Sequence, residues 1–328
     1  MFNKKDGIQS MAKILITGGA GFIGSHLAKK LIDLNNEIVI FDNLDSFYSE
    51  KLKNKNLESI APSDKYEFIR GDIRDYTAVC AVLDDIQVII HEAAQPGIRA
   101  SLENPMKTHE VNISGTLNIL RAAVTKNIKR VIIASSSSVY GDTNELPYRE
   151  EDSPQPLSPY GVSKLASDYY AKVFNEVYGL STVSLRYFSV YRPRIRPDLV
   201  LPIFTNALVQ NKKVRIFGDG EQSRDFTYID DIVEGTYRAM TKNHIDGETF
   251  NIASGKRTTI NKLYALLCEL VDRKSNLIHE KEKKGEVRHT HANINKARKH
   301  LGYKPRYNIQ QGLKQFIDWY QDNTFYLP

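Results

Sequence analysis

The sequence predicts an α/β protein in which a doubly wound parallel sheet is covered by a smaller α/β lobe. Short apolar runs rich in β-branched residues alternate with amphipathic segments through residues 11–180. This alternation is typical of parallel strands joined by right-handed helical crossovers. A glycine-rich segment also follows the first apolar run directly. Together these observations favour a sheet with helices on both faces.

The first element is a strand over Lys13–Thr17, followed by Gly18, Gly21 and Gly24 at G-x-x-G-x-x-G spacing. This pattern is typical of a Rossmann-type turn that holds a dinucleotide. Gly18 would form the tight turn, Gly21 would admit a pyrophosphate, and Gly24 would let the next helix pack closely. For three glycines alone, a glycine-rich turn without a ligand is the alternative.

The segment after this turn predicts a helix beginning near Phe22. Its first amides, including that of Ile23, would face the phosphates. A second apolar run, Ile38–Phe41, ends in Asp42 and Asn43. An acid here accepts hydrogen bonds from the adenosine ribose and repels a 2′-phosphate, which favours NAD over NADP. The alternative is an ordinary aspartate at the end of a strand.

A third strand is predicted over Tyr66–Ile69, and Gly71, Asp72 and Ile73 follow it. Asp72 would lie against the adenine amino group. A Gly-Asp pair directly after a strand is common in α/β folds, so the evidence for Asp72 is weaker than the evidence for Asp42.

The run Val131–Ala134 predicts a buried strand that ends in four serines, Ser135–Ser138. Polar residues at the carboxyl end of a parallel strand lie where open α/β sheets bind ligands. A hydroxyl from this run would relay a proton between a substrate oxygen and a nearby base. The alternative is a serine-rich loop that caps the next element.

Tyr160 and Lys164 are four residues apart at the start of a predicted helix, so they share one face. A tyrosine hydroxyl has an unperturbed pKa of about 10 and is a poor base at neutral pH. The Lys164 ammonium and an oxidised nicotinamide ring would lower that pKa. Taken alone, such a pair more often reaches solvent, but the serine run favours a catalytic role.

These segments resemble the extended short-chain dehydrogenase/reductase family and, within it, the nucleotide-sugar 4-epimerases. The resemblance extends from Lys13 to about Pro305. It includes further segments: His91–Gln95, Asn112, Arg186–Tyr191, Arg215–Gly220, Arg224–Asp231 and Phe250–Gly255. It implies an enzyme with bound NAD, cofactor contacts from Ala93 and Ala94, and Ser136 as the catalytic hydroxyl beside Tyr160 and Lys164.

The resemblance also indicates the reaction. Family members that remove water or carbon dioxide carry carboxylates just after the catalytic Ser/Thr, whereas this chain has Ser137 and Ser138. Without a carboxylate at these positions, no group on this segment can transfer the protons at C5 or C6 of the sugar. Inversion at C4 through a 4-keto sugar is therefore expected. The alternatives are a 4,6-dehydratase or decarboxylase of the family, or a non-catalytic NAD-sensing protein, although such proteins usually lose the Tyr-Lys pair.

The sugar is left open among UDP-glucuronate, UDP-glucose and UDP-N-acetylglucosamine. Ser189 stands where hexose epimerases of the family usually have Asn and uronate epimerases Thr. Four donors could together hold a carboxylate, namely Ser137, Ser138, Ser189 and Arg196. The segment from Gln95 to Arg99, also expected at the substrate, resembles relatives that act on several UDP-hexoses. Arg192 replaces the usual glycine of the nearby loop.

For the nucleotide half, the resemblance assigns Arg224 to the diphosphate and the strand holding Arg215 and Phe217 to the uracil. It assigns Glu286 to the uridine ribose. For Arg224 alone, an ion pair at the surface is the alternative.

The lobes are expected to interleave. Residues 11–180 would form the NAD-binding domain, with returning segments near 181–190 and 227–255, and 191–328 would mainly form the UDP-sugar-binding lobe. A homodimer is expected through helices near 106–125 and 159–178. The apolar residues proposed for it are Val111, Leu117, Leu120, Leu165, Tyr169 and Phe174.

Composition limits other classes of function. The 328 residues carry a net charge of +6, but the basic residues are dispersed, which a diphosphate ligand explains as well as nucleic acid would. No apolar run approaches the ~18 residues of a membrane span, and residues 1–9 lack a signal-peptide core. Cys80 and Cys268 suggest neither a disulfide framework nor a metal site. We expect a cytoplasmic enzyme of nucleotide-sugar metabolism and polysaccharide biosynthesis, with residues 1–10 as a dispensable extension.

Overall fold

The computed structural model describes most of the chain, namely residues 12–60, 62–143, 145–274, 276–282 and 286–323. The expected N-terminal extension lies outside these residues. Within them, no helix has the length and apolarity needed to cross a bilayer.

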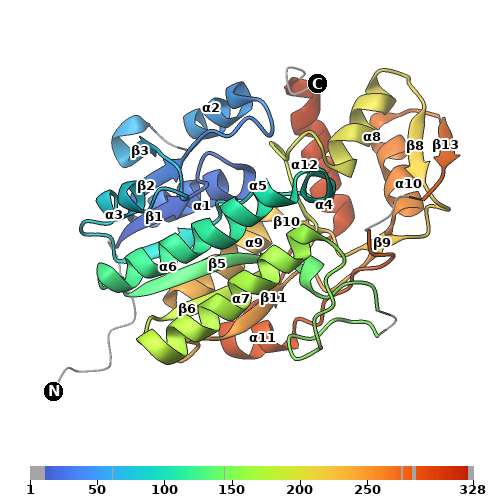
Figure 1. The fold of residues 1–328 in the computed structure, drawn as a ribbon. Helices are drawn as coiled ribbons and strands as arrows, with labels where there is room; N and C mark the ends of the chain where they lie inside the picture. Colours follow the sequence, from blue (N-terminus) through green and yellow to red (C-terminus); the bar gives the residue numbers. More distant parts are fainter. Residues whose placement is uncertain (1–11, 61, 144, 275, 283–285, 324–328) are drawn as a thin grey trace.

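A seven-stranded sheet, parallel throughout, forms the centre of the described part of the chain (Figure 1). In spatial order its strands are β11 (Thr249–Ile252), β6 (Thr182–Tyr187), β5 (Arg130–Ser136), β4 (Val88–His91), β1 (Lys13–Thr17), β2 (Glu37–Asp42) and β3 (Tyr66–Arg70). The winding direction reverses at β1, which pairs with β2 on one side and β4 on the other. Doubly wound sheets bind ligands at the carboxyl ends of the strands beside such a reversal.

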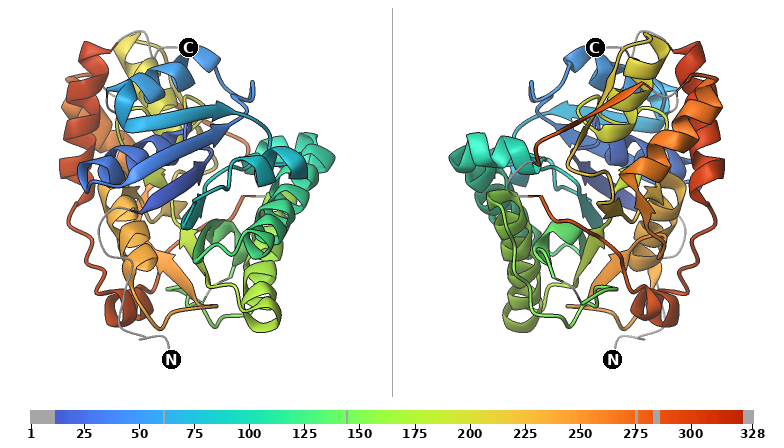
Figure 2. Two further views of the ribbon diagram at one scale, coloured as in Figure 1. Left: turned by 90° about the vertical axis from the view of Figure 1, so that its left-hand side faces the viewer. Right: turned by 90° about the vertical axis from the view of Figure 1, so that its right-hand side faces the viewer.

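Helices cover both faces of the sheet, as Figure 2 shows, which confirms the predicted fold class. One face carries α3 (Tyr76–Ala81), α6 (Thr116–Thr125) and α7 (Pro159–Tyr178). The other carries α1 (Phe22–Asp33), α9 (Ile229–Thr241) and α11 (Asn295–Leu301). Because both faces are covered, the central strands are apolar almost throughout rather than alternating.

The remaining structure forms the smaller lobe and the connections. The helices are α2 (Glu50–Glu58), α4 (Ile98–Glu103), α5 (Pro105–His109), α8 (Val200–Val209), α10 (Ile260–Val271) and α12 (Ile309–Asp322). Short turns are η1 (Ser63–Lys65), the π-helical η2 (Glu110–Gly115) and η3 (Ser137–Val139). Three strand pairs complete it: β8 (Val214–Phe217) with β13 (Leu277–Glu280), β9 (Ser223–Arg224) with β12 (Thr258–Thr259), and β7 (Val190–Tyr191) with β10 (Thr227–Tyr228).

The chain returns to the central sheet late: α9 packs on α1, and β11 pairs with β6. The division of residues between the two lobes remains a prediction.

Helix α7 begins and ends where its sequence dictates. The Ser158 side chain accepts a hydrogen bond from the Gly161 amide at 3.1 Å, and Pro159 occupies the first turn. The helix ends at Gly179, which has a φ of +68°. The helix thereby presents Tyr160 and Lys164 at its amino end, beside the carboxyl ends of the strands.

Two of the residues expected at a dimer interface are buried within the protein's own core. Leu120 and Phe174 pack against the sheet, so they are unavailable to a second copy. Tyr169 on the same helix as Phe174 is 56% exposed. The sequence pattern identified the apolar helices but not which of their residues face the sheet.

Candidate active site

A cavity of about 800 Å³ lies at the carboxyl ends of the strands and extends into the smaller lobe. Every residue predicted for the site lines it. The predicted cofactor residues are Gly18, Gly21, Phe22, Ile23, Gly24, Asp42, Asn43, Asp72, Ile73, Ala93, Ala94, Tyr160 and Lys164. The predicted substrate residues are Gln95, Arg99, Ser136, Ser137, Ser138, Ser189, Arg196, Arg215, Phe217, Arg224 and Glu286.

The glycine turn has the close packing that the sequence predicted. Gly18 has a φ of +70°, and a Cβ atom there would stand 2.7 Å from the Ala93 amide nitrogen. A Cβ atom on Gly24 would stand 2.4 Å from the Gly18 carbonyl oxygen, so α1 lies directly against the turn. The first turn of α1 contains no acidic residue. A helix N-terminus that follows a tight turn and carries no acidic side chain in its first turn fits the diphosphate of a dinucleotide.

Asp42 lies beside this turn and is held by backbone amides. Its two carboxylate oxygens accept hydrogen bonds from Ala20 N at 3.1 Å and Leu44 N at 2.8 Å. Burial raises the pKa of Asp42, and the nearby Lys53 ammonium opposes that rise. Lys53 also lines the cavity, and the sequence analysis missed it because a lysine on an amphipathic helix carries no distinguishing signal.

Asp72 is hydrogen-bonded by Arg74 of its own turn and by Asn43, which follows β2. Arg74 donates to both carboxylate oxygens, from Nε at 3.0 Å and from Nη2 at 2.8 Å. Asn43 Nδ2 donates to one of them at 2.9 Å. The hydrogen bonds from Arg74 lower the pKa of Asp72 to about 2. Its proposed contact with adenine remains a prediction.

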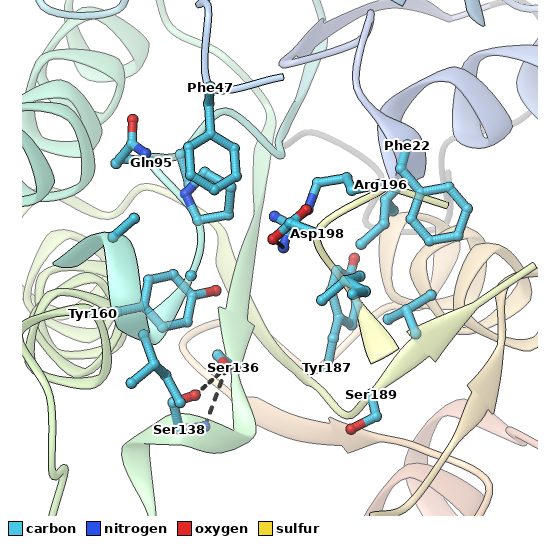
Figure 3. Close-up of a pocket in the computed structure, with 18 of the residues that line it drawn as sticks. Phe22, Phe47, Gln95, Ser136, Ser138, Tyr160, Tyr187, Ser189, Arg196 and Asp198 are labelled. Carbon is cyan, nitrogen blue, oxygen red and sulfur yellow. Dashed lines mark hydrogen bonds and ion pairs between the residues drawn. The ribbon is translucent and has the colours of Figure 1, made fainter. Parts of the chain in front are cut away.

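The expected reaction centre is assembled from α7 and the end of β5 (Figure 3). The Lys164 ammonium donates to the Ala134 carbonyl at 2.7 Å, which fixes the lysine beneath the serine run. Ser136 interacts with the Tyr160 hydroxyl. It also donates to Ser138 Oγ and accepts from Ser138 N, both at 3.1 Å. Ser136 therefore caps η3, as the alternative interpretation expected, and also faces Tyr160. Its role as a proton relay remains a prediction.

The electrostatics of Tyr160 differ from the expectation. Burial raises the pKa of Tyr160, and the cation that opposes this rise is Arg196 rather than Lys164. The Lys164 ammonium points instead to a backbone carbonyl. Burial also lowers the pKa of Lys164 to about 8. The tertiary surroundings of these two residues, rather than their spacing on the helix, set their protonation.

The residues proposed to hold the sugar lie on opposite sides of the cavity. Figure 3 shows Ser136 and Ser138 on one side and Ser189 on the other. Arg196 donates to both carboxylate oxygens of Asp198, at 3.1 and 3.2 Å. Its guanidinium also lies 5.5 Å from the centre of the Phe47 ring. Asp198 and Phe47 are cavity residues that the sequence analysis did not assign.

Three of the residues proposed for the nucleotide form one cluster with Arg99, namely Phe217, Arg224 and Glu286. Arg99 donates to Glu286 at 2.8 Å and lies 5.6 Å from the centre of the Phe217 ring. Arg224 lies 3.7 Å from the other Glu286 oxygen. By contrast, Arg215 is largely exposed and pairs with Glu280 at 3.2 Å.

Asn112, from the π-helical turn η2, supports the substrate side of the cavity. Its side chain accepts from Gln95 N at 2.7 Å and donates to Gln95 O at 3.1 Å. It also donates to Ser163 Oγ at 2.9 Å. Asn112 thus ties the segment that bears Gln95 to α7.

Comparisons with known proteins agree with this geometry. The family model described as GDP-mannose 4,6 dehydratase matches residues 15–316. The chain belongs to the extended short-chain dehydrogenase/reductase family. A putative UDP-glucose 4-epimerase of Methanocaldococcus jannaschii is 39% identical, over 95% of this chain and 99% of the relative.

Two solved structures of this family are similar over nearly their whole length. The UDP-glucuronic acid 4-epimerase of Bacillus cereus, in complex with UDP-glucuronic acid and NAD, has 36% identity and a TM-score of 0.91, with 94% of this chain and 99% of that chain covered. The UDP-glucose 4-epimerase of Thermotoga maritima with UDP-glucose has 34% identity and a TM-score of 0.89, with 95% and 99% covered.

The described residues contain no group of His, Cys, Asp and Glu arranged to hold a metal ion. Cys80 and Cys268 are both free thiols, each partly buried on its own helix.

Proposed function

We propose that this protein is an NAD-dependent 4-epimerase of a UDP-sugar. The observation that carries the proposal is the arrangement of Ser136, Tyr160 and Lys164 at the end of β5, with serines rather than carboxylates at positions 137 and 138. This segment therefore has no carboxylate that could act as general acid or base at C5 or C6 of the sugar. The relatives described above are named as epimerases of UDP-sugars, and NAD was bound in one of them.

In this proposal bound NAD would supply a hydride acceptor and donor at C4 of the sugar, so that hydride could leave one face and return to the other. Tyr160 Oη accepts the proton of the C4 hydroxyl, and Ser136 Oγ hydrogen-bonds the same oxygen. Lys164, at the amino end of the helix that bears Tyr160, is held by the Ala134 carbonyl, and its ammonium would contribute positive charge to the reaction centre. Tyr160 then returns the proton to the C4 oxygen. Because the hydride removed from C4 would also be the one restored to it, the reaction needs no external reductant.

For the sugar, we infer that UDP-glucuronate is the preferred substrate. Arg196 and the hydroxyls of Ser138 and Ser189 all line the cavity and would satisfy a carboxylate by charge-assisted hydrogen bonds. A second candidate is a neutral UDP-hexose. The Asp198 carboxylate favours it, because Arg196 already has an anionic partner at 3.1 Å.

The test is to incubate the enzyme separately with UDP-glucuronate, UDP-glucose and UDP-N-acetylglucosamine and to follow C4 inversion by proton NMR. Arg196→Ala is expected to lower kcat/KM for the uronate by about 10- to 100-fold, the worth of one charge-assisted hydrogen bond. Neutral sugars should lose less than the uronate, because for them the variant removes only the cation that opposes the rise in the pKa of Tyr160. Arg298→Ala, on the exposed side of α11, is the matched control.

Inversion of only the neutral sugars, unchanged by Arg196→Ala, would contradict the carboxylate site but leave the epimerase proposal intact. A product that has lost water or carbon dioxide would contradict the epimerase proposal itself.

We further propose that two copies associate through α7 and the neighbouring helices α4 and α5. The outward side of α7 exposes Tyr169, Val173 and Val177, and α5 exposes Met106 at 63%. Contiguous exposed apolar side chains of this kind are typical of protein interfaces. A cytoplasmic location and a role in supplying sugars for polysaccharide synthesis remain predictions.

A further inference from the structure

Glu92 occupies a position in the cavity to which the sequence motif assigned no role. It directly follows β4, and its amide donates to the Thr17 carbonyl at the end of β1 at 3.1 Å. Its carbonyl carbon would lie only 3.0 Å from a Cβ atom placed on Gly18. Glu92 therefore adjoins the glycine turn, and it lines the same cavity as Tyr160.

The Glu92 carboxyl is held by a chain of hydroxyl groups. The Tyr187 hydroxyl donates to Glu92 Oε1 at 2.9 Å and also lies 2.8 Å from Thr236 Oγ1. Thr236 Oγ1 in turn donates to the Ile232 carbonyl at 2.9 Å. Tyr187 and Thr236 are buried, so this chain fixes the carboxyl from the side of the protein core.

The chain accommodates both protonation states of the carboxyl. As a carboxylate, Glu92 accepts the single Tyr187 proton. As an acid, it can donate to Tyr187, which then donates to Thr236. Neither state leaves the Glu92 oxygen or the Tyr187 hydroxyl without a partner, which satisfies the requirement on buried polar groups.

The charged and titratable groups that face Glu92 lie at the reaction centre. Helix α7 contributes Lys164, whose pKa Glu92 raises, and Tyr160, whose pKa Glu92 raises as well. Strand β6 contributes Tyr187, and α9 contributes only the uncharged Thr236. Burial raises the pKa of Glu92 itself to about 7, against the Tyr187 hydrogen bond and the Lys164 charge.

The cofactor of the proposed function would bind beside Glu92. A dinucleotide with its diphosphate on the glycine turn has to reach Tyr160 with its nicotinamide end. Glu92 adjoins that turn and interacts electrostatically with both Tyr160 and Lys164. The oxidised nicotinamide ring is a cation, whereas the reduced ring is neutral. A carboxylate in a cavity of low polarity favours the cation strongly, because opposite charges interact more there than in water.

We propose that Glu92 is the charge partner of the oxidised nicotinamide and makes the site hold NAD⁺ in preference to NADH. The inference rests on the proposed function, and it adds a positioning residue that sets how readily the bound cofactor accepts hydride. When Glu92 is ionised, the bound cofactor is kept oxidised between turnovers. The 4-keto sugar is then reduced again only by the hydride it has just given up.

The test measures binding without any sugar, so it does not depend on which UDP-sugar is used. Protein stripped of cofactor is titrated calorimetrically with NAD⁺ and with NADH. The isosteric Glu92→Gln variant keeps an oxygen for Tyr187 but has no charge. It should shift the ratio of the two Kd values toward NADH by about tenfold, equivalent to about 1.4 kcal/mol. Glu37→Gln, at the exposed start of β2, should leave the ratio unchanged.

The pH dependence gives a second readout. In the wild type the preference for NAD⁺ should rise as the pH rises through about 7, where Glu92 loses its proton, and Glu92→Gln should show no such rise. Tyr187→Phe keeps the carboxyl but removes its donor, so the rise should move to higher pH. This variant also tests the proposal if Glu92→Gln fails to fold.

A ratio within twofold of the wild type in Glu92→Gln would overturn the proposal, and so would an equal shift in Glu37→Gln. Failure of the epimerase proposal would appear separately, as binding of NAD without C4 inversion of any UDP-sugar.

Discussion

Tyr160→Phe tests the reaction centre most directly. The substitution removes one oxygen from a partly buried ring and leaves the apolar contacts of the ring unchanged. Ser136 retains its hydrogen bonds with Ser138 at 3.1 Å, so the end of β5 should keep its shape. The Lys164 bond to the Ala134 carbonyl at 2.7 Å does not involve Tyr160 either. We therefore expect a folded protein that still binds NAD.

Tyr160→Phe should slow the chemical step and leave the binding of NAD unchanged. A positioned general base contributes roughly 10²- to 10⁴-fold to the rate, which corresponds to about 3 to 5 kcal/mol of the barrier. The assay follows C4 inversion by proton NMR and measures bound NAD by chromatography after denaturation. Tyr178→Phe is the matched control, since Tyr178 lies on the same helix and is 57% exposed.

Retention of more than about a tenth of the wild-type kcat would refute the assignment of Tyr160 as the base. Loss of bound NAD in parallel with turnover would show that the hydroxyl acts in cofactor binding instead.

Three further predictions concern the cofactor, the pH dependence and the assembly. Gly24→Ala places a Cβ atom 2.4 Å from the Gly18 carbonyl oxygen, and overpacking of this kind costs about 1–3 kcal/mol. Calorimetry should therefore show that the affinity for NAD falls about tenfold or more. An unchanged affinity would refute the close packing. Because burial lowers the pKa of Lys164 to about 8, its ammonium is present below that pH and lost above it. The kcat should therefore fall as the pH rises through about 8. A kcat that stays constant to higher pH would contradict a role for the ammonium. Light scattering should find two copies for the wild type and one for the double variant Tyr169→Glu, Val173→Glu, because both side chains are exposed on α7; a monomeric wild type would exclude the dimer.

The sequence predicted the parts of this protein that depend on local geometry. The spacing of Gly18, Gly21 and Gly24 after an apolar run predicted the tight turn, because a positive φ and a close helix approach both require a residue without a side chain. The spacing of Tyr160 and Lys164 predicted a shared helical face. Each predicted strand lies within one or two residues of an observed one, because a run of β-branched residues is itself the signal.

The sequence could not identify partners that the fold brings together from distant segments. Arg99 and Glu286 are separated by 187 residues, and Tyr187 and Glu92 by 95. Neither pair leaves a local periodic signal. Similarly, the pattern of α6 and α7 showed that both are apolar but not that Leu120 and Phe174 face the sheet.

The chemistry of the site was therefore determined in two stages. Residue types and their spacing determined that a glycine turn, the Tyr-Lys pair and a serine run would occur together at the strand ends. The tertiary structure alone decided their electrostatics: Arg196 rather than Lys164 as the cation opposing the rise in the pKa of Tyr160, Asp198 as the partner of Arg196, and Glu92 beside the glycine turn. Charge interactions depend on distance and on exclusion of water, and both are set only when the remote segments have packed.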